Sequence, residues 1–230
     1  MKKIVSLITI VFLLPSIGKT QFNEDQLGAW HMYFFNTTFK ESSFGVQGDI
    51  QYRNWDMGGD LEQLLIRGGV TYKPKNADIK FTLGYGNITK GAFGENTSTT
   101  SESRIYQEAL IPTKLSNRFN LTHRFRYEQR FNDGQDFRTR YRYNLFVNIP
   151  ITKNKLEAKT IYLALYNEIF INGQRDIGNG ARVEIFDINR FYSAIGYMIG
   201  PKAKVQAGLM RQSTNNWSKN QLQLSFHQKF

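Results

Sequence analysis

The sequence contains no cysteine, and after residue 20 it has no apolar run long enough for a transmembrane helix. Without cysteine the chain cannot form disulfides, thiolate nucleophiles or thiolate metal sites. Histidine is scarce as well, with three residues in 230. There is no Gly-x-Ser-x-Gly run and no histidine pair at metal-ligand spacing. We therefore expect no catalytic residue, no metal site and no cofactor.

The first residues have the pattern of a secretory signal peptide. Lys2 and Lys3 give a basic start, and an apolar core follows at 4–14. This core is shorter than the roughly 20 residues that a spanning helix needs. We expect a cleaved signal peptide at 1–20 and a single barrel domain at 21–230.

The part of the chain after the expected signal peptide is rich in positive charge and in aromatic residues. The formal net charge is +11, and it falls to +8 when the three lysines before residue 21 are removed with the signal peptide. Aromatic residues make up 14% of the chain, yet its mean hydropathy is −0.46. An exported chain of this composition fits a membrane β-barrel, because each strand of such a barrel is apolar on one face only.

The stretch 118–148 shows this pattern most clearly, in two runs separated by a polar turn at 132–136. Successive side chains of a β-strand point to opposite faces, so each run has one apolar and one charged face. The apolar parity holds aromatic and aliphatic residues: Phe119, Leu121, Phe125, Tyr127, Phe137, Tyr141, Tyr143, Leu145, Val147 and Ile149. The other parity holds mainly arginine, glutamate and asparagine. On the later run 156–171, Tyr162, Tyr166 and Phe170 share a parity with Glu168.

Alternation of this kind predicts eleven strands along the chain. They are expected at 27–37, 44–54, 61–72, 79–88, 102–111, 119–130, 137–149, 156–171, 182–199, 203–212 and 221–230. Bacterial single-chain barrels have even strand numbers. We therefore expect either ten strands, with 27–37 not forming a full strand, or twelve, with two strands merged into one elsewhere. The connections are expected to alternate between short turns and longer polar loops.

The predicted fold is an all-β, closed, antiparallel transmembrane up-and-down β-barrel of ten to twelve strands. A soluble β-sandwich is the alternative, since a second sheet would also cover the apolar faces. The strand lengths favour a membrane, because a tilted strand crosses a bilayer in about 9–11 residues. The last strand ends on Phe230, and barrels of this class commonly end in an aromatic residue.

Several motifs resemble a family of uncharacterised outer-membrane proteins of Gram-negative bacteria, prominent in Bacteroidetes-like genomes. The most specific motif is the run His-Arg-Phe-Arg-Tyr-Glu-Gln-Arg-Phe at 123–131, and others lie at 104–107, 138–142, 166–170 and 189–192. The similarity extends from about Leu27 to Phe230. It implies an outer-membrane barrel and supplies no catalytic residue.

If the apolar parity faces lipid, the charged parity lines the lumen. The expected lumen-lining residues are Arg53, Arg67, Arg104, Glu108, Arg124, Arg126, Glu128, Arg130, Arg138, Arg140, Arg142, Glu168 and Arg190. Arginine and glutamate on neighbouring strands can pair and fill a narrow barrel as a polar plug. The excess of arginine would instead favour a small passive pore that prefers anions. The alternative is an enzyme that acts on lipid or peptide at the outer rim.

The expected location is the bacterial outer membrane. The expected partners are outer-membrane lipid, lipopolysaccharide and the barrel-assembly machinery, which would recognise the C-terminal Phe230. The arginines alternate with aromatic residues rather than forming a patch, and no nucleic-acid-binding motif is present, so no nucleic-acid partner is expected.

Overall fold

The computed structural model describes residues 26–94, 96–116 and 118–230, and the expected signal peptide at 1–20 lies outside them. None of the described residues belongs to a helix that is long and apolar enough to cross a membrane. Eleven strands are described: β1 (Gly28–Thr38), β2 (Phe44–Asn54), β3 (Leu61–Tyr72), β4 (Lys80–Gly91), β5 (Thr99–Lys114), β6 (Asn120–Asn132), β7 (Arg138–Pro150), β8 (Ile161–Asn172), β9 (Phe186–Gly200), β10 (Ala203–Ser213) and β11 (Ser218–Lys229).

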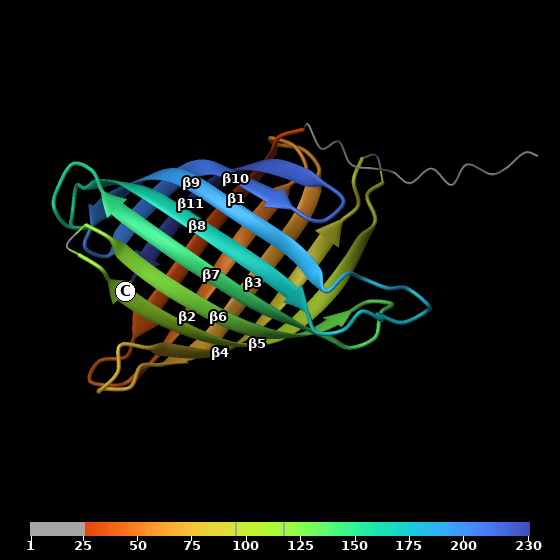
Figure 1. Ribbon diagram of the computed structural model, residues 1–230, viewed down its shortest axis with the longest axis horizontal. Coiled ribbons are helices and arrows are strands. Elements are labelled where there is room, and N and C mark those ends of the chain that lie inside the picture. Colours follow the sequence, from red (N-terminus) through yellow and green to blue (C-terminus); the bar gives the residue numbers. More distant parts are fainter. Residues whose placement is uncertain (1–25, 95, 117) are drawn as a thin grey trace, which may run out of the picture.

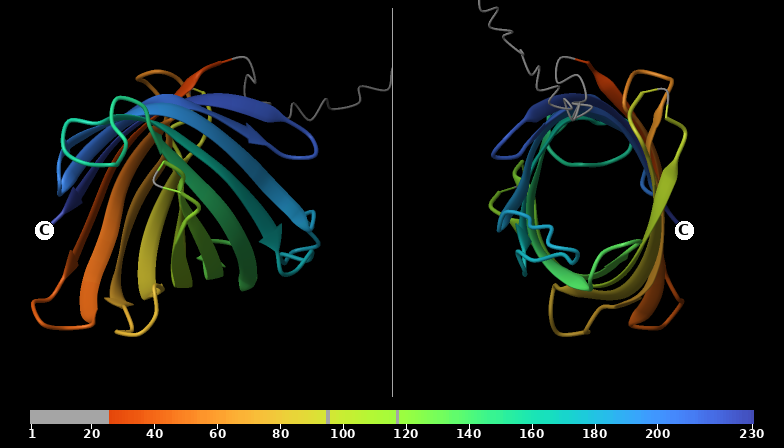
Figure 2. Two further views of the ribbon diagram at one scale, coloured as in Figure 1. Left: turned by 60° about the vertical axis from the view of Figure 1, so that its left-hand side comes forward. Right: turned by 90° about the vertical axis from the view of Figure 1, so that its right-hand side faces the viewer.

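The strands form one closed barrel in which each strand pairs with its neighbours in the sequence and β1 pairs with β11. The strands are tilted (Figure 1), and a view along the barrel shows an oval ring (Figure 2). The prediction of an all-β closed barrel of ten to twelve strands is confirmed. Closure satisfies the backbone groups that an open sheet would leave unpaired at its edges.

The expected even number of strands is wrong, and so is the exclusion of 27–37. Residues Gly28–Thr38 form a complete strand, and nine of them pair with β11 in a parallel register from Gly28↔Gln221 to Asn36↔Lys229. All other pairs are antiparallel. In an up-and-down barrel with an odd strand number, the first and last strands run the same way, and parallel pairing still completes the ladder.

Strand bounds agree best where the apolar alternation is strong. The strands β2 and β3 begin and end where expected, whereas β4 continues to Gly91 and β5 begins at Thr99. The polar loop expected at 89–101 is therefore shorter, because backbone ladder bonds continue through Thr and Ser residues that carry no apolar pattern. In the turn at 132–136, Gly134 has a φ of 69°, a conformation that glycine adopts without strain.

We call the barrel end where β1 begins the N-terminal end and the opposite end, where β11 finishes, the C-terminal end. The connections β2–β3, β4–β5, β6–β7, β8–β9 and β10–β11 lie at the N-terminal end, and the other five lie at the C-terminal end. The expected contrast between long loops and short turns is weaker than predicted. The β7–β8 connection (151–160) is longer than four of the five connections at the N-terminal end.

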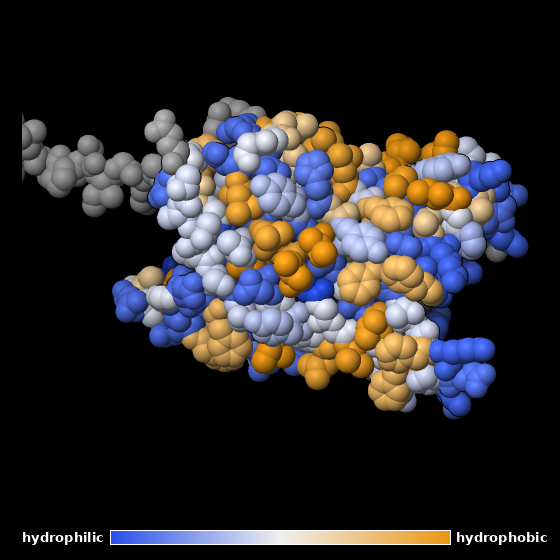
Figure 3. Space-filling view, turned by 180° about the vertical axis from the view of Figure 1, so that it is seen from behind, coloured by the Kyte–Doolittle hydropathy of each residue, from blue (hydrophilic) through white to orange (hydrophobic). Residues whose placement is uncertain are grey.

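The two faces of the barrel wall differ sharply in polarity. Large apolar side chains are exposed on the outer face of the wall, among them Ile66, Leu83, Tyr85, Phe191, Ile195 and Leu209. Figure 3 shows hydrophobic residues spread over the wall, with many of the hydrophilic residues gathered toward the ends. The charged and amide side chains of the opposite parity are buried inside. The barrel is therefore apolar outside and polar inside, the reverse of a soluble domain.

Some inward positions are glycines that make room for aromatic rings. A Cβ atom on Gly84 would lie 2.2 Å from the Tyr106 ring, and one on Gly196 would lie 2.2 Å from the Tyr162 ring. Both rings lie flat against the backbone of the neighbouring strand. The inner wall is thus filled by large side chains that pack over residues without one.

The parallel β1–β11 seam can be tested by disulfide cross-linking, because the chain has no native cysteine. His31 and Leu224 are register partners, so the double variant His31→Cys, Leu224→Cys should cross-link on oxidation, as adjacent strands bring Cα atoms to about 5 Å. The control pair His31→Cys, Asn220→Cys is displaced by four residues, roughly 13 Å along the strand, and should stay reduced. Cross-linking of the control pair alone would refute the register.

Candidate functional site: the charged interior

The expected lumen residues all lie on the inward parity of the strands that carry them. Twelve of the thirteen are buried, and the Arg124 side chain is 17% exposed. The structure brings most of them together in one network of ion pairs on the wall formed by β4 to β9. Four of the expected residues lie outside this network. Arg67 pairs separately with Asp49, Arg138 has no carboxylate within ion-pair distance among the described residues, and Arg53 and Arg190 lie against the ring of Trp30 on β1.

Glu128 on β6 is the centre of this network and is 1% exposed. Its carboxylate accepts hydrogen bonds from Nε and Nη2 of Arg140 at 3.0 and 2.7 Å and from Nη1 of Arg142 at 2.6 Å. The guanidinium groups of Arg104 and Arg126 each approach to 3.9 Å. Glu128 and Arg140 are register partners on adjacent strands, so the sheet itself sets this pair. One carboxylate thereby compensates several buried cations.

A second centre, Glu102, was not among the residues expected from the sequence. This fully buried carboxylate accepts hydrogen bonds from Nε of Arg104 at 2.5 Å and Nε of Arg130 at 2.6 Å, and it lies 2.6 Å from Nζ of Lys90. Arg104 and Arg130 are direct register partners, and Glu102 separates their like charges. Glu102 shares a parity with Arg104, and this could have indicated that it faces the interior. It was missed because it is the first residue of the expected strand.

The remaining members connect these centres across the wall. Glu168 on β8 accepts hydrogen bonds from Nη2 of Arg124 and Nη2 of Arg142, both at 2.6 Å. Glu108 on β5 binds its register partner Arg126 and also comes within 3.9 Å of Arg124. Arg142 contacts both Glu128 and Glu168, and Arg140 also pairs with Asp187 on β9 at 2.9 Å. The ion pairs therefore form a continuous chain over six strands, from β4 to β9.

Two further acidic residues on β2 and β3 were also missed. Asp49 pairs with its register partner Arg67 at 2.8 Å. Glu62 accepts hydrogen bonds from Nε1 of Trp30 at 3.1 Å and from Nε2 of Gln221 at 3.4 Å. The alternation along 44–54 places Asp49 on the same side as Arg53, which would have identified it. Glu62 follows a register shift between β2 and β3, so alternation alone does not place it inward.

The opposite inner wall is apolar and aromatic. This differs from the expectation of a lumen lined by charged residues. Trp30 on β1 packs in one buried cluster with Tyr162, Ala164, Tyr192, Ala194 and Met210 from β8, β9 and β10. The rings of Tyr166 and Tyr192 stack with their centroids 4.7 Å apart. Tyr162 and Tyr166 share a parity with the inward Glu168, and this pattern in the sequence could have predicted that their rings face the interior. The interior therefore has one ionic side and one aromatic side.

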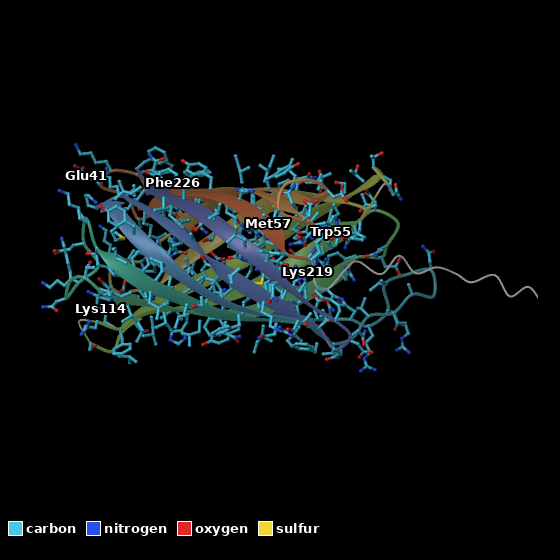
Figure 4. The ribbon with its side chains drawn as sticks, turned by 90° about the horizontal axis from the view of Figure 1, so that it is seen from above. Glu41, Trp55, Met57, Lys114, Lys219 and Phe226 are labelled. Carbon is cyan, nitrogen blue, oxygen red and sulfur yellow. The ribbon has the colours of Figure 1, made fainter. Side chains whose placement is uncertain are left out.

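A cavity of about 340 Å³ lies between the two sides. Its lining extends from Trp30 and Arg190 to Asn36, Asn148 and Lys204, which lie close to the C-terminal end. The half toward the N-terminal end is filled instead by buried side chains such as those of Glu102, Ile88, Phe170, Lys219 and Gln221. Figure 4 shows Glu41 and Lys114 at the C-terminal end, with Trp55 and Lys219 toward the other.

Three interior arginines lack a carboxylate within ion-pair distance among the described residues: Arg53, Arg138 and Arg190. Arg53 and Arg190 both line the cavity. Each lies over the ring of Trp30, with its Cζ atom 3.7 and 4.9 Å from the ring centroid, respectively. This cation–π contact offsets part of the cost of burying their charge.

The three histidines lie on different strands. His123 lies 2.9 Å from the hydroxyl of Tyr143, and His227 lies 3.0 Å from Oγ of Ser225 at the cavity lining. His227 also stacks on Phe34, with ring centroids 4.6 Å apart. Over the ranges that the structure describes, no group of three or more His, Asp or Glu residues is arranged to hold a metal ion.

These features define a closed β-barrel with an apolar exterior and an interior of buried arginine–glutamate pairs. The chain belongs to the family described as "Protein of unknown function (DUF2490)", which it matches over residues 27–223. The match covers β1 to β10 and half of β11. Comparison with curated proteins and with solved structures gives no match.

The buried network predicts a large difference between two glutamate substitutions. Glu128→Gln leaves several guanidinium groups without their counter-charge and should lower the free energy of unfolding by about 3–5 kcal/mol. Glu157→Gln removes the exposed ion pair with Lys153 and should change the free energy of unfolding by less than about 1 kcal/mol. Urea denaturation of the two variants in detergent measures the difference. Equal midpoints would show that the network contributes little to stability.

Proposed function

We propose that this protein is an outer-membrane β-barrel. The observation that supports this most directly is the reversed polarity of the wall. Large apolar side chains face outward on most strands, while the arginine–glutamate network is enclosed. Water does not favour such an exterior, whereas the hydrocarbon of a bilayer does. A closed ladder is also the only β-structure whose backbone groups are all satisfied within a membrane.

A lipid environment predicts that the cost of an outward arginine depends on its depth. Ile66 lies in the middle of β3 and Ile199 at the end of β9, and they are 54% and 50% exposed. In a bilayer, Ile66→Arg should destabilise the barrel by about 2–4 kcal/mol, and Ile199→Arg by about 0–1 kcal/mol. Folding titrations in lipid vesicles measure both values. Two equal, small effects would indicate that water surrounds the wall.

We propose further that the interior acts as a plug, so that the barrel is structural rather than an open channel. The support is the burial of the N-terminal half of the lumen, where Glu102, Ile88 and Gln221 are at most 1% exposed. The excess of arginine over acidic residues is the feature that favours the second possibility, a small anion-preferring pore.

Conductance across planar bilayers separates the plug from the pore. The plug predicts no steady conductance above that of protein-free membranes, because side chains fill half of the passage. The variant Glu102→Gln, Glu128→Gln loosens the plug and should produce channel openings. Its control is Glu157→Gln, at an exposed pair. A steady, anion-selective current through the unmodified barrel would contradict the plug.

The proposed partners follow from the same location. They are outer-membrane lipid, lipopolysaccharide near the basic connections, and the barrel-assembly machinery, which would recognise the exposed C-terminal Phe230. The backbone N–H of Phe230 donates to the carbonyl of Asn36 at 3.0 Å, so the last residue extends the β1–β11 seam while its ring stays accessible.

A hydrolase is the alternative function, and the hydrogen bond between Ser225 and His227 is the observation that favours it. A serine nucleophile needs a base that is itself oriented by a third group. No carboxylate lies within ion-pair distance of His227 in the described part of the chain; its ring stacks on Phe34 instead. We therefore propose no enzymatic activity. Hydrolysis of ester reporters that is lost in Ser225→Ala would overturn this.

A further inference from the structure

Arg190 is a buried cation whose natural partner in the sheet is already occupied. Its register partner on β8 is Glu168, but that carboxylate binds Arg124 and Arg142 instead. Only Nε of Arg190 has a hydrogen-bond partner among the described residues, the Oε1 atom of Gln212 at 2.7 Å. Arg190 lines the cavity, and its Cζ atom lies 4.9 Å from the centroid of the Trp30 ring and 4.7 Å from that of Phe170.

Arg53, which also lies over the ring of Trp30, is in the same situation. Its three hydrogen bonds go to the neutral amide oxygens of Gln51 and Gln63. The carboxylate of Asp49, on the same inward face of β2, is held by Arg67 at 2.8 Å. Five N–H groups are available on each guanidinium, so both arginines keep donors free for an anion beside Trp30.

Beyond the two arginines, part of the cavity wall offers an apolar surface on which an apolar tail can lie. There the lining of the cavity includes Met32, Phe34, Tyr106, Phe146 and Tyr192. On β1 it follows four successive inward positions, from Trp30 to Asn36, which span roughly 20 Å along the strand. Polar and charged residues of the ionic side, such as Glu108, Arg126 and Glu168, face this apolar surface, and their charges are already paired with one another or with neighbouring arginines.

We propose that the cavity binds an organic monocarboxylate with an unbranched apolar tail. The carboxylate lies beside Trp30, where it accepts hydrogen bonds from Arg190 and Arg53. The tail extends toward the C-terminal end between Phe34 and Phe146. The anion supplies a carboxylate within ion-pair distance, which these two arginines lack in the described part of the chain, and the ion pairs of the network stay as they are.

Titration calorimetry with octanoate tests the site on the purified barrel in detergent, with empty micelles as the blank. Arg190→Gln and Arg53→Gln should each weaken octanoate binding by about tenfold or more, because a charge-assisted hydrogen bond is lost. The matched control Arg182→Gln changes an exposed arginine in the β8–β9 connection and should bind as the unmodified protein does. Octan-1-ol should bind at least about tenfold more weakly, as should inorganic phosphate.

The fluorescence of Trp30 gives a second measurement that needs no change to the arginines. Bromine quenches tryptophan, and Trp30 is the tryptophan that lines the cavity. We expect 2-bromooctanoate, with bromine beside the carboxylate, to quench more than 8-bromooctanoate, and Trp30→Phe to remove the difference. No octanoate binding, phosphate binding as tight as octanoate, or stronger quenching by 8-bromooctanoate would each overturn the proposal. Conductance and membrane location are separate measurements, so this site can fail while the proposed barrel function stands.

Discussion

A guanidinium group enclosed in a protein costs several kcal/mol unless a counter-charge compensates it, and ten such groups point into this barrel. The four glutamates at positions 102, 108, 128 and 168 make most of the compensation possible. Each of them contacts at least two cations, so the strands that carry them must keep their register. A shift of one residue in a strand would turn its inward charges outward and its outward apolar side chains inward.

This constraint explains why the interior is divided into two sides. The wall from β4 to β9 places carboxylates and arginines at adjacent inward positions, where they satisfy one another. The wall that contains β1, β9 and β10 has few acidic residues, and aromatic rings fill it instead. The two arginines that reach this side, Arg53 and Arg190, rest on the ring of Trp30. The cavity lies where the two kinds of packing meet.

Alternation in the sequence was sufficient to place the strands and to separate inward from outward residues. Arg126, Glu128 and Arg140 could be assigned to the interior because each lies next to an outward aromatic residue, Tyr127 or Tyr141. The partners within the interior could not be assigned, because pairing depends on the register between strands. Glu102 shows this: its contacts with Lys90 and Arg130 come from two different neighbouring strands. The expectation for 27–37 is wrong for another reason. It came from the even strand numbers of bacterial barrels, whereas the residues of this segment have the apolar character of a strand.

The parallel seam between β1 and β11 has a consequence for topology. A chain that crosses a membrane an odd number of times has its two ends in different compartments. If the barrel spans a bilayer as proposed, an epitope placed before Gly28 and one placed after Phe230 would be reached by antibodies from opposite sides of it. Any segment attached before β1 would then lie in a different aqueous compartment from one attached after β11.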